Sequence, residues 1–152
     1  FSFVGVNAPT YGKEISTLQS EGWITSDGVL APEHDAAHIH WGGDWRMPTY
    51  QEFNDLISKC DWVWTSTNGV NGYIVRGKGD YSSVSIFLPC AGVGGGTSFG
   101  SAGSYGCYWS SVPNSDNDVA WSLGFDSGGR YTYYNSLRYS GRSVRPLQGF
   151  TK

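Results

Sequence analysis

The segment from Thr49 to Cys60 carries the strongest folding signal in the chain. Thr49 is followed three residues later by Glu52, the spacing of a capping box, in which each side chain satisfies a backbone N–H at the start of a helix. The apolar residues then fall at i, i+3, i+4 and i+7 and share one helical face: Phe53, Leu56, Ile57 and Cys60. This pattern predicts an amphipathic helix over residues 50–59.

The remaining signals place helix early and strand late. Pro32 can open a helix, because its missing N–H is no loss at the first helical position, and Gly42 and Gly43 end the short helix expected over residues 33–41. From Trp62 onward the helical period is lost, and short apolar runs alternate with turn residues. Strands are predicted within residues 1–7, 22–32, 60–77, 84–89, 106–112, 119–125 and 143–147. Two early helices and several later strands indicate an α+β domain.

Length and composition describe one globular unit. The 152 residues fit a single domain over residues 1–152. Charged residues make up 15% and aromatic residues 16%, and there are 22 glycines. A chain so rich in aromatic residues and glycine is expected to be loop-rich and held by aromatic packing rather than disordered.

The charge is unevenly distributed along the chain. No Asp or Glu follows Asp126, so this last segment has a charge of +5, and the remainder is −8 because the whole chain is −3. A basic tail can meet nucleic acid, but no Lys/Arg run and no nucleic-acid motif accompanies it, so no nucleic-acid partner is expected. No apolar stretch has the length of a membrane span, so direct membrane insertion is not expected. The chain starts at Phe1 without Met, as an excised or processed domain would.

The candidate sites for metal, phosphate and catalysis are weak. His34 and His38 are four residues apart in an expected helix and could hold a metal; the alternative is a surface or capping role for each. The glycine run at residues 92–96 lacks the GK[ST] ending of a phosphate loop, so a tight or mobile loop is expected. No GxSxG and no cysteine in a catalytic frame is present. We therefore expect no metal, no cofactor and no enzymatic activity.

The three cysteines form no CxxC pair, which excludes a zinc ribbon. An odd number leaves at least one thiol free or intermolecular. If any pair is bonded, Cys90 and Cys107 are the favoured partners, since one follows a predicted strand and the other begins the next.

The segment RYTYYNSLRYSGRS, residues 130–143, has the composition of a binding loop. It holds four tyrosines, three arginines and three serines, and no acidic residue. Tyrosine supplies contact area at low entropic cost, and Ser and Asn supply adaptable hydrogen bonds. A tyrosine-rich, irregular edge of a β domain is the alternative interpretation, and composition alone does not separate the two.

Several motifs together give the chain a family resemblance. The stretches WGGDWRMPTYQEFNDLISKCDWVWT, GVNGYIVRG, SIFLPCAG, GSYGCYWSS, LGFDSG and SVRP resemble, in that order, the Fibrobacter succinogenes major paralogous domain. The resemblance covers residues 32–147, and residues 1–31 match only loosely. That family is common in gut Bacteroidetes, often in surface lipoproteins. It implies a C-type lectin-like fold, with two helices around a small, twisted, mostly antiparallel β core and long loops.

The same fold implies a ligand-binding face, formed by the long loops and the late strands. No EPN, QPD or WND calcium signature is present, so calcium-dependent sugar binding is not expected. Variable proteins of diversity-generating retroelements also use this fold, and their mutated AAY codons exclude Trp, Glu, Lys, Met and Gln. None of these types occurs between Ser122 and Ser140. Ordinary family members carry similar residues here, so diversification and a fixed surface both stay open.

The candidate ligand-binding residues all lie in this segment. Ser122, Gly124 and Asp126 alternate with Leu123 and Phe125, so they are expected on one strand face. The full set is expected to form one exposed, contiguous patch: Ser122, Gly124, Asp126, Arg130, Tyr131, Tyr133, Tyr134, Asn135, Leu137 and Arg138. The residues expected in the core are Trp45, Phe53, Leu56, Phe87, Leu88, Trp109, Leu123, Phe125 and Val144.

The functional expectation is a non-catalytic recognition module of a surface or phage-borne protein. Its partner is expected to be a protein or glycan ligand on a cell surface, and its location extracellular, on a cell surface or on a phage particle. The alternative is a fixed carbohydrate-binding or assembly domain of a bacterial cell-surface lipoprotein. Formylglycine-generating enzymes use a related fold, but they resemble longer chains with a reactive cysteine pair that this sequence lacks.

Overall fold

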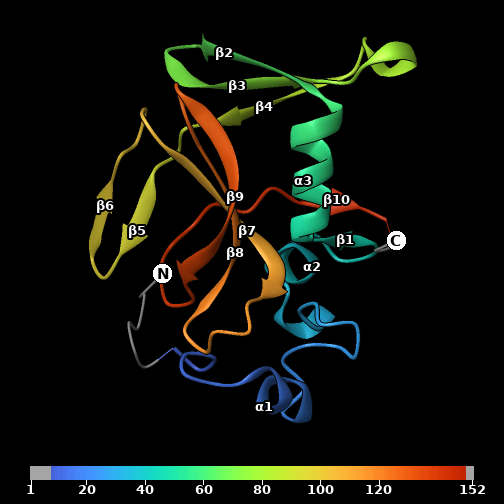
Figure 1. Ribbon diagram of the computed structural model, residues 1–152, viewed down its shortest axis with the longest axis vertical. Coiled ribbons are helices and arrows are strands. Elements are labelled where there is room, and N and C mark those ends of the chain that lie inside the picture. Colours follow the sequence, from blue (N-terminus) through green and yellow to red (C-terminus); the bar gives the residue numbers. More distant parts are fainter. Residues whose placement is uncertain (1–7, 150–152) are drawn as a thin grey trace.

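A computed structural model describes residues 8–149 and shows an α+β domain (Figure 1). Its helical elements are α1 Ile15–Ser20, the 3-10 helix η2 Pro32–His34, α2 Ala36–Trp41, α3 Tyr50–Lys59 and the 3-10 helix η3 Gly79–Tyr81. Its strands are β1 Trp45–Arg46, β2 Asp61–Thr67, β3 Val70–Arg76, β4 Ser85–Pro89, β5 Val93–Gly95, β6 Ser98–Gly100, β7 Gly106–Pro113, β8 Val119–Asp126, β9 Gly129–Leu137 and β10 Leu147–Gln148.

The strands form four small antiparallel sheets. Two have three strands, in the orders β2-β3-β4 and β7-β8-β9, and two are the pairs β1-β10 and β5-β6. The helix α3 runs beside β7-β8-β9, β2-β3-β4 crosses one end of that sheet, and α1 lies at the opposite end (Figure 1). The predicted α+β class is therefore confirmed. No helix in the described part of the chain is long and apolar enough to cross a membrane.

The predicted capping box of α3 is confirmed. The Thr49 hydroxyl accepts a hydrogen bond from the Glu52 backbone N–H at 3.2 Å, and the Glu52 carboxylate accepts one from the Thr49 N–H at 2.8 Å. The same carboxylate pairs with both terminal nitrogens of Arg46, at 2.7 and 2.6 Å. This ion pair ties the start of α3 to β1.

The helix expected over residues 33–41 is instead broken in two. Asp35 separates η2 from α2 and has an extended backbone. Its buried carboxylate accepts hydrogen bonds from the N–H groups of Ala37, His38 and Met47, at 2.8, 3.2 and 2.8 Å. An aspartate side chain competes for backbone donors and favours a cap over a helix interior, so Asp35 begins a new helix.

The core lies between α3 and the two three-stranded sheets. Its buried members are Phe53, Tyr73, Val75, Leu88, Cys90, Tyr108, Leu123 and Phe125. The Phe125 ring is stacked on Tyr108 and makes edge contacts with Tyr73 and Trp62, at centroid distances of 5.8, 5.6 and 6.2 Å. Aromatic packing thus holds the sheets together, as the composition predicted.

Four of the nine predicted core residues are buried: Phe53, Leu88, Leu123 and Phe125. The other five are half-buried, so most of each side chain is covered, as predicted: Trp45, Leu56, Phe87, Trp109 and Val144. Small sheets cover only part of each large side chain, so rings near an edge keep one side in solvent.

All three cysteines carry free thiols, so the Cys90–Cys107 disulfide is not formed. Both thiols are buried, and Cys107 instead lies with its sulfur 3.7 Å from the Ser122 hydroxyl. The glycine run at residues 92–96 is also more ordered than a loop. It forms β5 and the start of the turn to β6, and Gly94 exchanges two 2.8 Å backbone hydrogen bonds with Gly141.

Candidate ligand-binding site

The predicted binding residues lie on or just after the β8-β9 hairpin. In its register Ser122 pairs with Tyr133, Gly124 with Tyr131, and Asp126 with Gly129. One oxygen of the Asp126 carboxylate accepts hydrogen bonds from the N–H groups of Gly128 and Gly129, at 2.7 and 3.1 Å. These bonds fix the turn, so the two strands leave it in a defined register.

Exposure divides the ten predicted residues. Four are exposed: Asp126, Tyr131, Tyr134 and Asn135. Four are partly exposed: Arg130, Tyr133, Leu137 and Arg138. Ser122 and Gly124 are buried, so the prediction that they are exposed was wrong.

Aromatic rings above β8 explain the burial of Gly124. A β-carbon at Gly124 would collide with the ring of Tyr133 and the phenol oxygen of Tyr105, so both tyrosines lie directly on this glycine. The neighbouring Ser122 hydroxyl is 2.7 Å from that of Ser136 on β9. The strand face that alternation predicted to meet the ligand is therefore covered by tyrosine rings.

The exposed tyrosines lie on two faces of β9, so the predicted single patch is also corrected. Tyr133 lies on Gly124, and the Tyr131 ring lies beside it on the same face, with ring centroids 6.0 Å apart. Tyr134 lies on the α3 side, where it makes an edge contact with Trp121 at 5.9 Å. Tyr133 and Tyr134 are consecutive, and successive side chains of a strand point to opposite faces, so alternation separates these groups.

A second aromatic group continues from Tyr134 onto α3. Trp121 stacks on Tyr50 with centroids 4.4 Å apart. Close by, the Thr132 hydroxyl donates a 2.8 Å hydrogen bond to the side-chain oxygen of Asn54. Three site residues were not predicted from the sequence: Tyr50, Tyr105 and Trp121. Trp121 could have been placed on this face, because it shares the strand alternation of Leu123 and Phe125. No sequence signal brings Tyr105 to Gly124.

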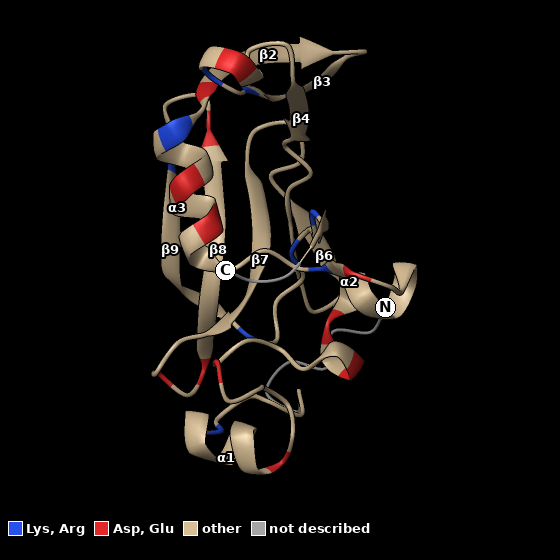
Figure 2. Ribbon diagram, turned by 90° about the vertical axis from the view of Figure 1, so that its right-hand side faces the viewer, with Lys and Arg blue, Asp and Glu red and all other residues tan. Residues whose placement is uncertain are grey.

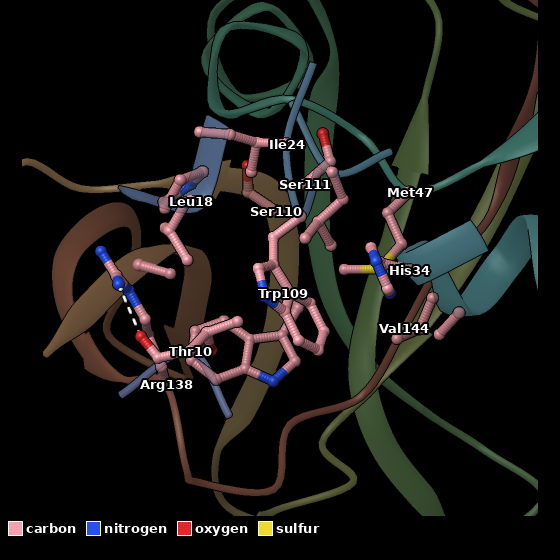
Figure 3. Close-up of a pocket in the computed structure, with 15 residues that line it drawn as sticks. Thr10, Leu18, Ile24, His34, Met47, Trp109, Ser110, Ser111, Arg138 and Val144 are labelled. Atoms are coloured by element: carbon pink, nitrogen blue, oxygen red, sulfur yellow. Dashed lines mark hydrogen bonds between the residues drawn. The ribbon is translucent and has the colours of Figure 1, made fainter. Parts of the chain in front are cut away.

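Arg138 is a structural residue and not part of an exposed patch. Its guanidinium donates hydrogen bonds to the backbone carbonyls of Thr10, Lys13, Asn114, Asp116 and Val119, at distances of 2.8 to 3.2 Å. Burial lowers the pKa of this guanidinium, an effect that the nearby Asp118 carboxylate opposes. Arg138 thus joins the N-terminal segment to the β7-β8 connection, and the bond to Thr10 is visible in Figure 3.

Arg130 also turns away from the face of β9 that carries Tyr131 and Tyr133, here called the tyrosine face. Its guanidinium lies over the Trp62 and Tyr73 rings, 5.3 and 6.0 Å from their centroids. Its buried Nε has no hydrogen-bond partner. Cation–π contacts of this kind stabilise the charge against the core, so Arg130 is not placed to meet a ligand beside Tyr131.

The two phenols that lie on Gly124, those of Tyr105 and Tyr133, are neutral. Burial raises the pKa of the Tyr133 phenol, with smaller contributions from Asp126 and Tyr131. Burial and the neighbouring Cys107 thiol raise the pKa of the Tyr105 phenol. Both hydroxyls therefore keep their protons at neutral pH and can donate or accept hydrogen bonds at this surface.

A separate cavity of about 240 Å³ lies between the N-terminal segment and β7 (Figure 3). It is mostly apolar, and its lining includes Leu18, Ile24, Met47, Trp109 and Val144. Ser111, which is 3% exposed, also lines it, and its hydroxyl has no hydrogen-bond partner. The cavity can accommodate a small apolar group, and its lining contains none of the β9 tyrosines.

The two histidines considered as metal ligands are separated. His34 lies in η2 and stacks on Trp23, with ring centroids 4.1 Å apart, whereas His38 lies in α2. Among residues 8–149 no group of three or more His, Cys, Asp or Glu side chains could hold a metal ion. The break at Asp35 removes the shared helical face on which the metal alternative depended.

Comparison with known proteins gives one match. No curated protein and no solved structure matches the chain, and the match comes from a protein-family model. A family model described as a domain of unknown function (DUF8237) matches residues 54–147, which include α3 from its fifth residue and all of β2 to β9. The match covers more than half of the chain, and the protein therefore belongs to the DUF8237 family.

Proposed function

We propose that this domain is a non-catalytic recognition module that binds a protein or glycan through the tyrosines of β9. The observation that carries the proposal is the exposure of Tyr131 and Tyr134, at 58% and 57%, on a hairpin whose turn is fixed by Asp126. Large rings presented on a rigid scaffold release much surface from water when a partner covers them. Their low side-chain entropy reduces the loss on binding.

The composition of the face supports binding rather than catalysis. Its hydroxyls belong to neutral phenols. The one carboxylate in the hairpin, Asp126, is engaged by the turn N–H groups. Arg130 lies over the Trp62 ring, and Arg138 is held by backbone carbonyls, so neither guanidinium is directed at a partner. A partner would therefore meet aromatic surface and neutral hydrogen-bonding groups.

The finer assignment rests on the sequence resemblance. We propose a C-type lectin-like domain, exposed on a bacterial cell surface or a phage particle, whose β9 segment is a candidate for diversification. Tyr131, Tyr134 and Asn135 are exposed and have residue types that AAY mutagenesis can produce. A reverse-transcriptase gene beside an imperfect repeat that encodes residues 120–145 would establish diversification, and a locus with neither would exclude it. The alternative, a fixed carbohydrate-binding or assembly domain of a surface lipoprotein, would bind through the same β9 residues.

The binding proposal is tested with purified domain on a glycan array and on a panel of purified bacterial surface proteins. Each ligand found is then titrated against Tyr131→Ala, Tyr134→Ala and the control Tyr81→Ala, which removes a 72% exposed tyrosine on η3. At least one β9 variant should weaken binding about 30-fold, or about 2 kcal/mol, with an unchanged melting temperature. Full affinity in both β9 variants, or an equal loss with Tyr81→Ala, would refute the proposed site.

A further inference from the structure

The outer edge of β9 is an unpaired strand edge. β9 pairs with β8 only. The two-residue turn makes Asp126 and Gly129 the closing pair of the hairpin, and antiparallel alternation then directs the N–H and C=O groups of Arg130 and Thr132 away from β8. In the described part of the chain no backbone group pairs with these positions.

This edge has few of the features that normally prevent strand pairing. Residues 129–137 contain no Pro, Lys, Asp or Glu, and Figure 2 shows β9 at the margin of the fold without an acidic residue along it. The single charge, Arg130, is held over Trp62 and does not cross the edge. Only the irregularity after Tyr133 limits the regular stretch. Proteins usually protect such edges with charges, proline or a covering loop.

We propose that the β9 edge pairs with the β9 edge of a second copy of this chain, antiparallel and centred on Thr132. In this register Thr132 faces the partner's Thr132, Arg130 faces the partner's Tyr134, and Tyr131 faces the partner's Tyr133. No like charges meet, and threonine pairs and aromatic pairs across strands are favourable. A two-fold axis satisfies both edges with one set of contacts.

Preorganisation favours a second copy over a flexible peptide. The β9 strand is already held by its register with β8, by the Asp126 turn and by the bond from Thr132 to Asn54. Pairing two such strands orders little additional backbone, whereas a flexible peptide would lose conformational entropy on binding. The dimer would have a continuous six-stranded sheet with Tyr131 and Tyr133 of both copies on one face, and two linked faces can bind a multivalent ligand with higher avidity.

The test is analytical ultracentrifugation of the whole chain, without ligand, from micromolar to millimolar concentration. Thr132→Pro removes the outward N–H at a position where an edge strand tolerates proline. Thr132→Ala is the matched control, since it removes the side-chain bond to Asn54 and keeps the backbone donor. We expect dimers for the wild type and Thr132→Ala, and a dimer dissociation constant raised at least about tenfold for Thr132→Pro. A wild type that stays monomeric, or a Thr132→Pro variant that dimerises equally well, would overturn the proposal.

Amide hydrogen exchange tests the same contact without a substitution. Protection of the Arg130 and Thr132 amides in the wild type should rise with protein concentration, while Gly79 in η3 gives a reference remote from the edge. Protection that is independent of concentration at both amides would contradict the dimer. Neither experiment uses a ligand, so the inference does not depend on the proposed function.

Discussion

Arg138 connects segments of the chain that are distant in sequence, through five hydrogen bonds to backbone carbonyls. We expect Arg138→Ala to lower the free energy of unfolding by about 2–4 kcal/mol, because hydrogen bonds from a charged group are lost and the carbonyls of Thr10, Lys13 and Asn114 lose their donor. Arg138→Lys should recover only part of this, since an ammonium cannot reproduce the planar donor geometry. Urea unfolding measures both, with the exposed Arg76→Ala as control. Equal stability of the Arg138 and Arg76 variants would contradict the structural role.

Ionisation of the Tyr108 phenol should reduce the stability of the fold at alkaline pH. Burial raises its pKa above the ordinary tyrosine value, an effect that Arg145 partly opposes, and its hydroxyl donates a 2.8 Å hydrogen bond to the Pro89 carbonyl. A raised folded-state pKa contributes stability below the unfolded pKa of about 10, and this contribution is lost as the pH rises above that value.

Tyr108→Phe should therefore flatten the fall in stability as the pH rises above about 10 toward the raised folded-state pKa. It should also be less stable at neutral pH by about 1 kcal/mol, because the bond to Pro89 is lost. Urea unfolding at several pH values provides the measurement, and the exposed Tyr81→Phe is the matched control. A Tyr108→Phe variant with the wild-type alkaline slope would show that this phenol is not responsible.

At the scale of the element, two glycines on neighbouring strands predict losses of stability of different size. A β-carbon at Gly106 on β7 would collide with the Phe125 ring, which is 1% exposed and packed against Tyr73 and Tyr108. A β-carbon at Gly124 on β8 would instead meet the Tyr133 ring and the Tyr105 phenol oxygen, and both tyrosines are partly exposed and can move outward. The Phe125 ring is enclosed by its neighbours and cannot shift, whereas the Tyr133 ring has solvent beside it.

We therefore expect Gly106→Ala to destabilise the domain by about 1–3 kcal/mol through overpacking. Gly124→Ala should lower stability by less than about 1 kcal/mol. It should also move Tyr133 and lower the affinity for any ligand that binds the β9 tyrosines. Thermal and urea unfolding of the two variants make the comparison. Similar losses in both would show that the tyrosines above Gly124 are as rigid as the core.

At the scale of the molecule, the family match and the folded unit have different extents. The match begins at residue 54, but Phe53 is in the core, Leu18 and Ala37 are buried, and the Ser111 carbonyl accepts a 2.8 Å hydrogen bond from the Leu30 N–H. Removing residues 1–53 would delete the α3 cap at Thr49 and expose apolar surface on β7.

A fragment of residues 54–147 should therefore fail to fold cooperatively, whereas residues 8–149 should unfold in one transition. Circular dichroism during thermal unfolding, together with the dispersion of amide proton shifts, distinguishes the two. A fragment with dispersed shifts and a sharp transition would show that the N-terminal segment is dispensable.

The sequence by itself determined α3, the strand segments that form β3, β4, β7 and β8, and the burial of Leu123 and Phe125. These features depend on local signals: a capping box at Thr49, a helical period, and strict alternation along one strand. It also located the surface tyrosines in β9, because their density in a short segment leaves some without room in the core.

Only the tertiary structure decided which side chains of that segment meet solvent. Gly124 is buried by Tyr105 and Tyr133, and the Tyr134 ring meets Trp121 on the α3 side. Arg138 is held by carbonyls from three other parts of the chain. Alternation assigns a residue to a face of a strand, but the exposure of that face depends on what the rest of the chain places upon it. Such contacts join residues far apart in sequence, and no local pattern encodes them.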